Sequence, residues 1–371
     1  MNFDNSISAF FELVKAGLWC KDVLLSPYEK INWEEIYQLA EEQSVMGVVL
    51  AGIDHSNIKP PQEELLQWIG KVQMLEQQNK EMNQLIAELI EKMRNADIYT
   101  LLVKGQGIAQ CYERPLWRAS GDVDFYLSDD NYSKAKKYFR PLVDKFDPDT
   151  EYAQHINMHY GEWVVEIHAN QHCSLSARVN RVMDEIHRDL FYGGNVRSWN
   201  NSNTQVFLPS PDNDVLIVFV HFLNHFYKGG LGVRQICDWC RLLWTYRSEL
   251  DLKLLESRIR KMGLMNVWRG FAAFAVEYLG MPKEAMPFYS TDKNWKRKAE
   301  KISSFIIEVG NFGHNRDSSY YNNNSKLYRK ATSFRRRCGD MLHHAKIFPF
   351  ETLRFFPNMV YNGLRAVARG E

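Results

Sequence analysis

The chain lacks a strong net charge and any long apolar run. With 46 Lys and Arg against 45 Asp and Glu in 371 residues, its formal net charge is +1. No overall attraction to nucleic acid or to an anionic membrane is therefore expected. No apolar run approaches the roughly 20 residues that a membrane-spanning helix needs. The first residues are acidic and polar where a secretory signal would be basic.

The chain also lacks a cysteine framework. Its six cysteines are scattered without regular spacing, which favours reduced thiols and excludes a disulfide-stapled secreted domain. Cys237 and Cys240 have C-x-x-C spacing, but no second such pair completes a zinc site. We interpret them as two buried free thiols and expect a cytoplasmic protein without a transmembrane segment.

What is present is the composition of an ordinary globular protein. Hydrophobic residues make up 45% and charged residues 25%, while an aromatic content of 13% favours large packed helical regions. A chain of this length can hold two or three domains. We predict an N-terminal helical region over residues 1–95, an α+β domain over 96–200, and a C-terminal helical domain with a basic tail over 210–371.

The N-terminal region shows apolar residues at helical spacing. This pattern predicts helices over Ser6–Trp19 and Ile31–Ile53. From Gln62 to Asn95 the chain is rich in Glu, Gln, Lys, Leu and Met, which predicts one long helix. Its apolar stripe either faces the core of its own domain or offers a coiled-coil surface to a partner.

The middle region changes to mixed periodicity. Strands are predicted at Ile98–Val103, around Phe125, at Ile156–His159 and at Glu162–Ala169, with helices at Gly107–Tyr112, Tyr132–Phe139 and Arg178–Leu190. Residues 198–211 are polar and end in two prolines, so we interpret them as a linker. Later helices are predicted at Asp214–Tyr227, Gly232–Tyr246, Leu252–Met262, Val267–Leu279 and Trp295–Val309, followed by a loop over Asn311–Ser325.

The most informative stretch contains two aspartates two residues apart. Asp122 and Asp124 follow a glycine-containing turn and alternate with apolar residues. In a strand both carboxylates would project from one face, where each would raise the pKa of the other. A bound divalent cation would remove that repulsion, so the pair is typical of half a Mg²⁺ site. The alternative is a strand end with solvated carboxylates.

A second strand supplies another acid. Glu166 and His168 alternate with Val165 and Ile167 and therefore share a face. Glu166 is a candidate third metal ligand or proton acceptor, or else a surface glutamate on an edge strand. His168 either orients Glu166, contacts substrate, or is a simple hydrogen-bonded strand histidine.

This succession of motifs resembles the nucleotidyltransferase fold of the DNA polymerase beta superfamily. In detail it is similar to a bacterial family of uncharacterised nucleotidyltransferases. The matching residues are Lys104-Gly105, Arg118, Gly121-Asp122-Val123-Asp124 and Val165-Glu166-Ile167-His168, within a resemblance that covers residues 95–245. It implies a nucleotidyltransferase-like mixed β-sheet module, in an α+β protein, flanked by N-terminal and C-terminal helical regions.

The resemblance also implies an activity, the transfer of a nucleoside monophosphate from an NTP to a hydroxyl acceptor. Asp122, Asp124 and Glu166 would hold Mg²⁺ or Mn²⁺, and Glu166 could instead act as the base. The acceptor could be a protein side chain, a small molecule or an RNA end. The residues expected to contact the nucleotide are Lys104, Gly105, Gln106, Arg118 and His168.

One of these positions departs from the superfamily pattern. Gln106 stands where a serine that touches phosphate is usual, which supports the alternative of a catalytically inactive binding protein with the same fold. Arg118 either contacts phosphate, pairs with Asp122 or forms a structural ion pair.

Further polar motifs lie outside the module. His221 and His225 share one helix face, and Arg234 and Asp238 lie on the next helix with i,i+4 spacing, which allows them to pair. The two helices either wall the nucleotide pocket or form an interdomain structural network. His155 and His159 share a strand face. The basic segment Lys326–Lys346 could bind RNA, a membrane surface or a partner protein, or be a solvated helix face.

Overall fold

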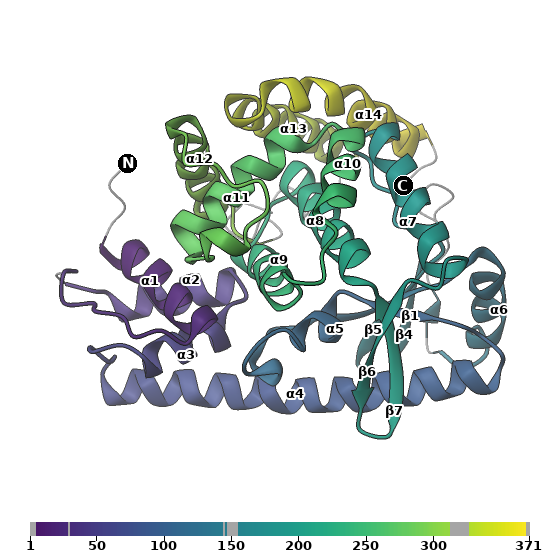
Figure 1. Cartoon of the computed structure of the whole chain (residues 1–371), viewed down its shortest axis with the longest axis horizontal. Coiled ribbons are helices and arrows are strands. Elements are labelled where there is room, and N and C mark those ends of the chain that lie inside the picture. Colours follow the sequence, from purple (N-terminus) through teal and green to yellow (C-terminus); the bar gives the residue numbers. More distant parts are fainter. Residues whose placement is uncertain (1–4, 29, 144, 147–154, 312–325, 369–371) are drawn as a thin grey trace.

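The computed structural model describes residues 5–28, 30–143, 145–146, 155–311 and 326–368. The helices before the sheet are α1 (Asn5–Trp19), α2 (Trp33–Glu42), α3 (Met46–Asp54) and α4 (Gln62–Asn95). A mixed sheet follows, and helices form most of the remainder (Figure 1). The α+β class predicted from the sequence, with helical regions at both ends, is confirmed.

The N-terminal helices pack closely because of two glycines. A Cβ on Gly52 of α3 would lie 2.0 Å from the Leu13 carbonyl oxygen of α1, and a Cβ on Gly17 would lie 1.9 Å from the Val48 carbonyl oxygen. The predicted continuous helix over Ile31–Ile53 is wrong. The chain breaks at Ser44, whose φ of 57° is incompatible with a right-handed helix, so α2 and α3 are separate.

The long helix α4 begins and ends where the sequence predicted. At 34 residues it spans about 51 Å and runs along one side of the molecule (Figure 1). Trp68 and Val72 join a core with the N-terminal and C-terminal helices, whereas residues from Met82 to Met93 join a core with the sheet. Its apolar stripe from Val72 to Met93 is therefore largely buried within its own chain, as the core-facing interpretation required, whereas Leu66 near its start is exposed.

The sheet has the strand order β1-β2-β5-β4-β3. Its strands are β1 (Leu101–Val103), β2 (Asp122–Tyr126), β3 (Lys145–Phe146), β4 (His155–Tyr160) and β5 (Trp163–His168). Strands β2 and β5 are parallel, with Asp124 opposite Glu166, and the other pairs are antiparallel. Gly161 turns β4 into β5 with a φ of +59°. This register places the two acidic motifs side by side.

Short helices connect and cover the strands. These are α5 (Gly105–Ala109), the 3₁₀ turn η1 (Pro115–Trp117), α6 (Asp129–Phe139) and α7 (Ala177–Phe191). In α7, the Ser176 side chain caps the first turn by accepting the Val179 N–H. The predicted helices around residues 107–112, 132–139 and 178–190 are thus present with shifted ends.

The predicted linker over residues 198–211 is wrong. Most of it forms a hairpin of β6 (Val196–Asn201) and β7 (Thr204–Pro209). Val206 and Leu208 of β7 are buried against the sheet and α4, and Ser202 turns the chain with a φ of 54°. Of the polar residues that suggested a linker, Ser198, Asn200 and Gln205 face outward. Asn201 and Thr204 are buried beside the turn, and alternate apolar residues hold the hairpin in place.

The C-terminal helices up to residue 309 agree closely with the predicted ones, whereas the helix over residues 349–368 was not predicted. They are α8 (Pro211–Lys228), α9 (Val233–Thr245), α10 (Leu252–Met262), α11 (Met265–Leu279), the 3₁₀ turn η2 (Lys283–Ala285), α12 (Lys293–Val309), α13 (Lys326–Ile347) and α14 (Pro349–Ala368). The predicted loop over 311–325 lies, apart from Asn311, outside the described residues. The domain boundaries at residues 95, 200 and 210 stay a prediction.

Candidate active site

The site begins at the turn after β1. Lys104 has φ 57° and ψ −147°, a conformation that side-chain-bearing residues rarely adopt, and Gly105 follows with φ +42°. A Cβ on Gly105 would lie 3.6 Å from the Asp122 carbonyl oxygen, so the turn rests on the start of β2. The turn thereby aims the Lys104 side chain at the carboxylates of the sheet.

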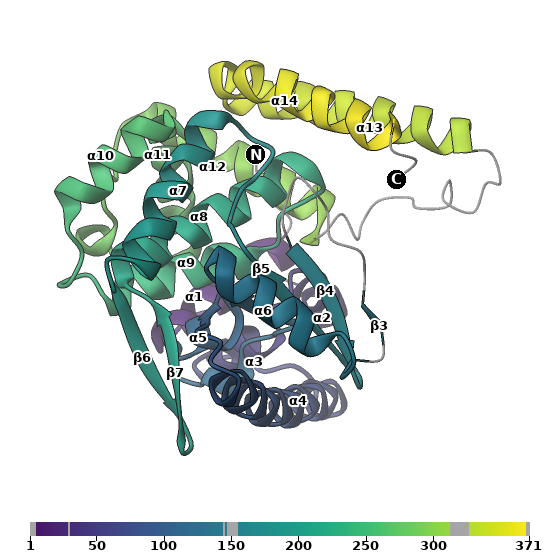
Figure 2. The same ribbon diagram turned by 90° about the vertical axis from the view of Figure 1, so that its right-hand side faces the viewer.

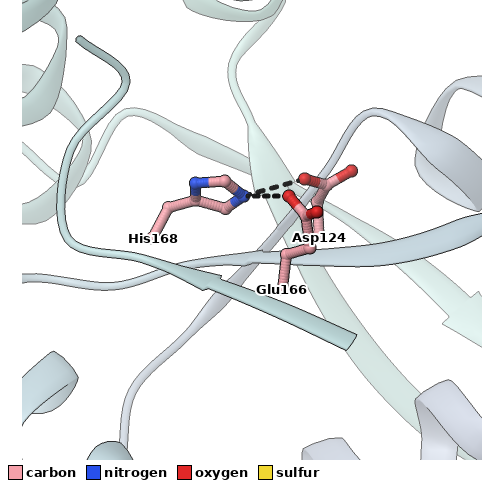
Figure 3. Close-up of side chains that lie close together, drawn as sticks. All are labelled: Asp124, Glu166 and His168. Atoms are coloured by element: carbon pink, nitrogen blue, oxygen red, sulfur yellow. Dashed lines mark hydrogen bonds and ion pairs between the residues drawn. The ribbon is translucent and has the colours of Figure 1, made fainter. Parts of the chain in front are cut away.

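Asp124 and Glu166 form the centre of the site. They are neighbours across the parallel pair β2 and β5, while Val123 and Val165 point into the core on the opposite face. Figure 3 shows the His168 ring facing both carboxylates. Its Nε2 lies 2.9 Å from Asp124 Oδ1 and 3.2 Å from Glu166 Oε2. The alternation read from the sequence therefore brings these side chains together.

Lys104 also contacts the carboxylates of this centre. Its Nζ lies 2.6 Å from Asp124 Oδ1, and only 11% of the Lys104 side chain and 4% of the Asp124 side chain are exposed. Burial would raise the pKa of Asp124, but Lys104 and the His168 hydrogen bond hold that pKa well below its usual range. Burial likewise opposes the charge of Lys104, but Asp124 and Asp122 outweigh it and raise the Lys104 pKa.

Asp122 lies at the rim of the same pocket. It begins β2, and partial desolvation together with the charge of Asp124 raises its pKa. The group of possible metal-binding side chains found among the described residues consists of Asp124, Glu166 and His168, whose ligand atoms lie within 4.8 Å of one another. Of the three predicted metal ligands, Asp124 and Glu166 lie together, and His168 joins them. Asp122 lines the same pocket but is not part of this group.

The donor chemistry fits a divalent cation. Two carboxylates supply the oxygen ligands that Mg²⁺ and Mn²⁺ prefer, and an imidazole nitrogen is a better ligand for Mn²⁺ than for Mg²⁺. Burial raises the pKa of Glu166, but the hydrogen bond and charge of His168, together with the charge of Lys104, outweigh burial and lower that pKa, so the carboxylate form is favoured. The centre opens into a pocket of about 220 Å³.

Residues 29–280, more than half of the chain, match the model of a protein family described as uncharacterised nucleotidyltransferase. The chain belongs to this family. Comparisons with curated proteins and with solved structures gave no match. The match contains the glycine turn, both acidic strands and helices α8 and α9, and it extends beyond the stretch in which the resemblance was recognised.

In this nucleotidyltransferase-family chain, Gln106 points away from the pocket. Its Nε2 donates to Asn79 Oδ1 of α4 at 2.7 Å, and the side chain is 1% exposed. Asn79 in turn donates to the Leu116 and Arg118 carbonyl oxygens at 2.8 Å each. Gln106 therefore fastens α5 to α4, and its difference from serine does not remove a side chain from the carboxylate centre.

Arg118 has a partner that the sequence did not suggest. Its Nε and Nη2 donate to the two carboxylate oxygens of Asp238 in α9, at 2.9 and 2.7 Å. Asp238 also accepts from the Tyr112 hydroxyl at 2.8 Å. The interpretation of Arg118 as a structural ion pair is the one that this geometry supports, and the Arg234–Asp238 pair is replaced by Arg118–Asp238.

Helices α8 and α9 form the far wall of the pocket. His221 and His225 line it, with their Nε2 atoms 3.2 Å apart. Arg234 also lines it, donates from Nη1 to the Ala119 carbonyl oxygen at 2.8 Å, and has a buried Nε without a hydrogen-bond partner. Of the two interpretations left open by the sequence, this lining supports the pocket wall, and it adds a buried guanidinium to the pocket.

A larger groove, of about 820 Å³, adjoins the pocket at Gly121. One side is the middle of α4, with Gln73 and Gln77, and another is the β4–β5 turn, with Glu162 and Trp163. Sequence reasoning missed both this groove and Asn79. The signal for Asn79 was an asparagine on the apolar stripe of α4, seven residues after Val72, but nothing in the sequence marked the groove.

Cys237, Cys240 and His155 do not line the pocket. Cys237 and Cys240 are buried free cysteines, as interpreted. The His155 ring stacks on His168 with centroids 5.6 Å apart. Among the described residues, no helix combines the length and apolarity required to cross a membrane.

Proposed function

We propose that the protein transfers a nucleoside monophosphate from an NTP to a hydroxyl acceptor. The observation that carries this proposal is the register of β2 and β5, which sets Asp124 beside Glu166 with Asp122 two residues away, all facing the glycine turn. Membership of a nucleotidyltransferase family supports the same reaction class. The free cysteines, all six of them, favour a cytoplasmic location.

In the proposed reaction, Asp122, Asp124 and Glu166 hold Mg²⁺ or Mn²⁺. When bound, the metal supplies charge stabilisation to the attacking and leaving oxygens. Lys104 and Arg234 are the pocket cations suited to the negative oxygens of the triphosphate. His168 positions Asp124 and Glu166 by bonding to both.

In the proposed transfer one bond to the α-phosphorus forms and another breaks. The acceptor oxygen forms a bond to the α-phosphorus, and the bond from that phosphorus to the oxygen leading to the β-phosphorus breaks. Pyrophosphate leaves with the electron pair of the broken bond. Glu166, half-buried and held in its carboxylate form, accepts the hydroxyl proton.

The groove beside the pocket is suited to the acceptor. Its charged side chains are Glu41, Lys71, Glu81 and Glu162, and Lys71 is already paired with Glu41 at 2.6 Å. This acidic lining repels the negatively charged backbone of an RNA chain. We therefore favour a protein side chain or a neutral or cationic small molecule over an RNA end as the acceptor.

The test measures incorporation of label from each α-³²P NTP, with Mg²⁺ or Mn²⁺, into the protein itself, bulk RNA and a small-molecule extract. The loss variant is Asp122→Asn/Asp124→Asn. The matched control is Asp129→Asn/Asp130→Asn, which removes two exposed carboxylates at the start of α6. Label that disappears only in the loss variant supports the proposal.

Two other outcomes contradict it. NTP binding by thermal shift without any transfer would favour the inactive binding protein. Label that persists in the loss variant would place the chemistry elsewhere.

A further inference from the structure

The helix pair α13 and α14 leaves a row of apolar side chains in solvent. Of eleven exposed large hydrophobic side chains in the described chain, four belong to this pair. They are Leu342 (70% exposed), Phe350 (75%), Leu353 (73%) and Tyr361 (61%). Figure 2 shows the pair as an outer layer over the C-terminal helices.

Three of these residues form one stripe on α14. Phe350, Leu353 and Tyr361, together with exposed Pro357, are spaced at i, i+3, i+7 and i+11. At 3.6 residues per turn they lie within roughly 80° of one another around the helix. We call these four residues the α14 stripe.

The opposite face of the pair is firmly packed. The Phe355 ring of α14 lies 5.0 Å from Tyr227 of α8, and the His344 ring of α13 lies 4.5 Å from Phe226. Phe348, between the two helices, is fully buried. Because the pair is already packed through this opposite face, the α14 stripe is not needed for its attachment to the rest of the chain.

The exposed charge on the described part of the helix pair has one sign. Among the described residues of the pair, the exposed charged side chains are Arg335, Lys346 and Arg354, whereas Glu351 is buried. The sequence from residue 326 to 371 contains ten Lys and Arg and three Asp and Glu, in a chain whose net charge is only +1. The basic charge is therefore concentrated in the segment of the sequence that also carries the exposed apolar side chains.

We propose that α13 and α14 bind the surface of an anionic lipid bilayer, with the α14 stripe inserted at the headgroup–acyl boundary. Apolar side chains combined with basic ones match that surface, because acyl chains receive the former and anionic headgroups attract the latter. A second copy of the chain would present the same positive charge and repel this face. RNA would use the basic side chains but would leave the stripe in water.

The experiment is co-sedimentation of the full chain with vesicles of phosphatidylcholine alone and of phosphatidylcholine with phosphatidylserine. We expect binding to the anionic vesicles that weakens with added salt and is much weaker on the neutral ones. Phe350→Ser/Leu353→Ser should reduce the partition coefficient by roughly tenfold or more. The control is Leu24→Ser/Leu66→Ser, which removes two side chains of similar exposure elsewhere (69% and 60%) and should bind as the wild type.

The remaining readouts keep the proposal falsifiable. Circular dichroism and thermal unfolding check that each variant is folded. Arg335→Gln/Lys346→Gln/Arg354→Gln should reduce binding to anionic vesicles without touching the stripe. The proposal is overturned if the wild type fails to sediment with anionic vesicles. It is also overturned if light scattering shows a dimer that Phe350→Ser/Leu353→Ser abolishes. It is likewise overturned if the basic residues bind polyuridine and not the anionic vesicles.

Discussion

Arg118 and Asp238 form a buried two-point ion pair between segments 120 residues apart in the chain. Each side chain is 5% exposed, and the pair ties the segment before β2 to helix α9. Because α9 also carries Arg234, this contact holds the guanidinium of the pocket wall in register with the acidic strands. The pair is thus a positioning element of the candidate site.

Breaking the Arg118–Asp238 ion pair should strongly destabilise the fold. We expect Asp238→Ala to lower the free energy of unfolding by about 3–5 kcal/mol, because it leaves the Arg118 charge buried without a partner. The exposed pair Arg260–Glu256 is the control, and Glu256→Ala should cost less than about 1 kcal/mol. Urea unfolding measures the free energy of unfolding of both variants. Equal losses in Asp238→Ala and Glu256→Ala would contradict a buried Arg118–Asp238 pair.

Replacing Gln106 by serine should not improve binding of the nucleotide. Gln106→Ser removes the 2.7 Å hydrogen bond to Asn79 and leaves a void between α5 and α4, at a cost of about 1–3 kcal/mol. The exposed Gln77→Ser should change stability by less than about 0.5 kcal/mol. A lower KM for NTP in Gln106→Ser would show instead that this position faces the substrate.

Removing Lys104 should make the protein depend more on metal. In Lys104→Met, Asp124 loses its ion pair with Lys104 and keeps the contact with His168, so stability without metal should fall by about 1–3 kcal/mol. Mn²⁺ should then raise the melting temperature more than in the wild type, since a bound cation replaces the missing charge.

Lys71→Met serves as the control for this measurement. It breaks an exposed pair with Glu41 that has the same 2.6 Å separation. Thermal unfolding in EDTA and in Mn²⁺ compares the two variants. The same Mn²⁺ shift in Lys104→Met and the wild type would argue against a metal at Asp124.

The histidine pair of α8 should make stability fall in mild acid. Burial, aided by the charge of Lys104, lowers the pKa of His225 to about 4 from a usual value of 6.5. The unfolded chain then binds a proton that the folded chain does not, so stability is lost as pH falls from 6.5 towards 4, by up to about 3 kcal/mol.

His225→Gln should flatten this slope, because glutamine does not titrate. His55→Gln, which changes a histidine on the surface at the end of α3, is the comparison. Unfolding free energies measured from pH 7 to pH 4 separate the two. An unchanged slope in His225→Gln would assign the acid sensitivity to other groups.

Local pattern was enough to predict much of the fold and the centre of the site. The limits of α4 and α10 agree with their spacing of helix formers, and alternation along β2 and β5 correctly put Asp124 and Glu166 on one face with valines on the other. Periodicity works here because side-chain direction in a helix or strand depends only on neighbouring residues.

Tertiary packing decided the partners. The sequence could not say that Gln106 would turn to Asn79, that Arg118 would choose Asp238, or that a polar stretch would form the β6–β7 hairpin. Each outcome depends on which distant surfaces come together and on which buried polar groups must then be satisfied. By itself the sequence determined the faces of the elements and the family to which the chain belongs. Only the tertiary structure decided which side chains meet the carboxylates, because those contacts join segments far apart in the chain.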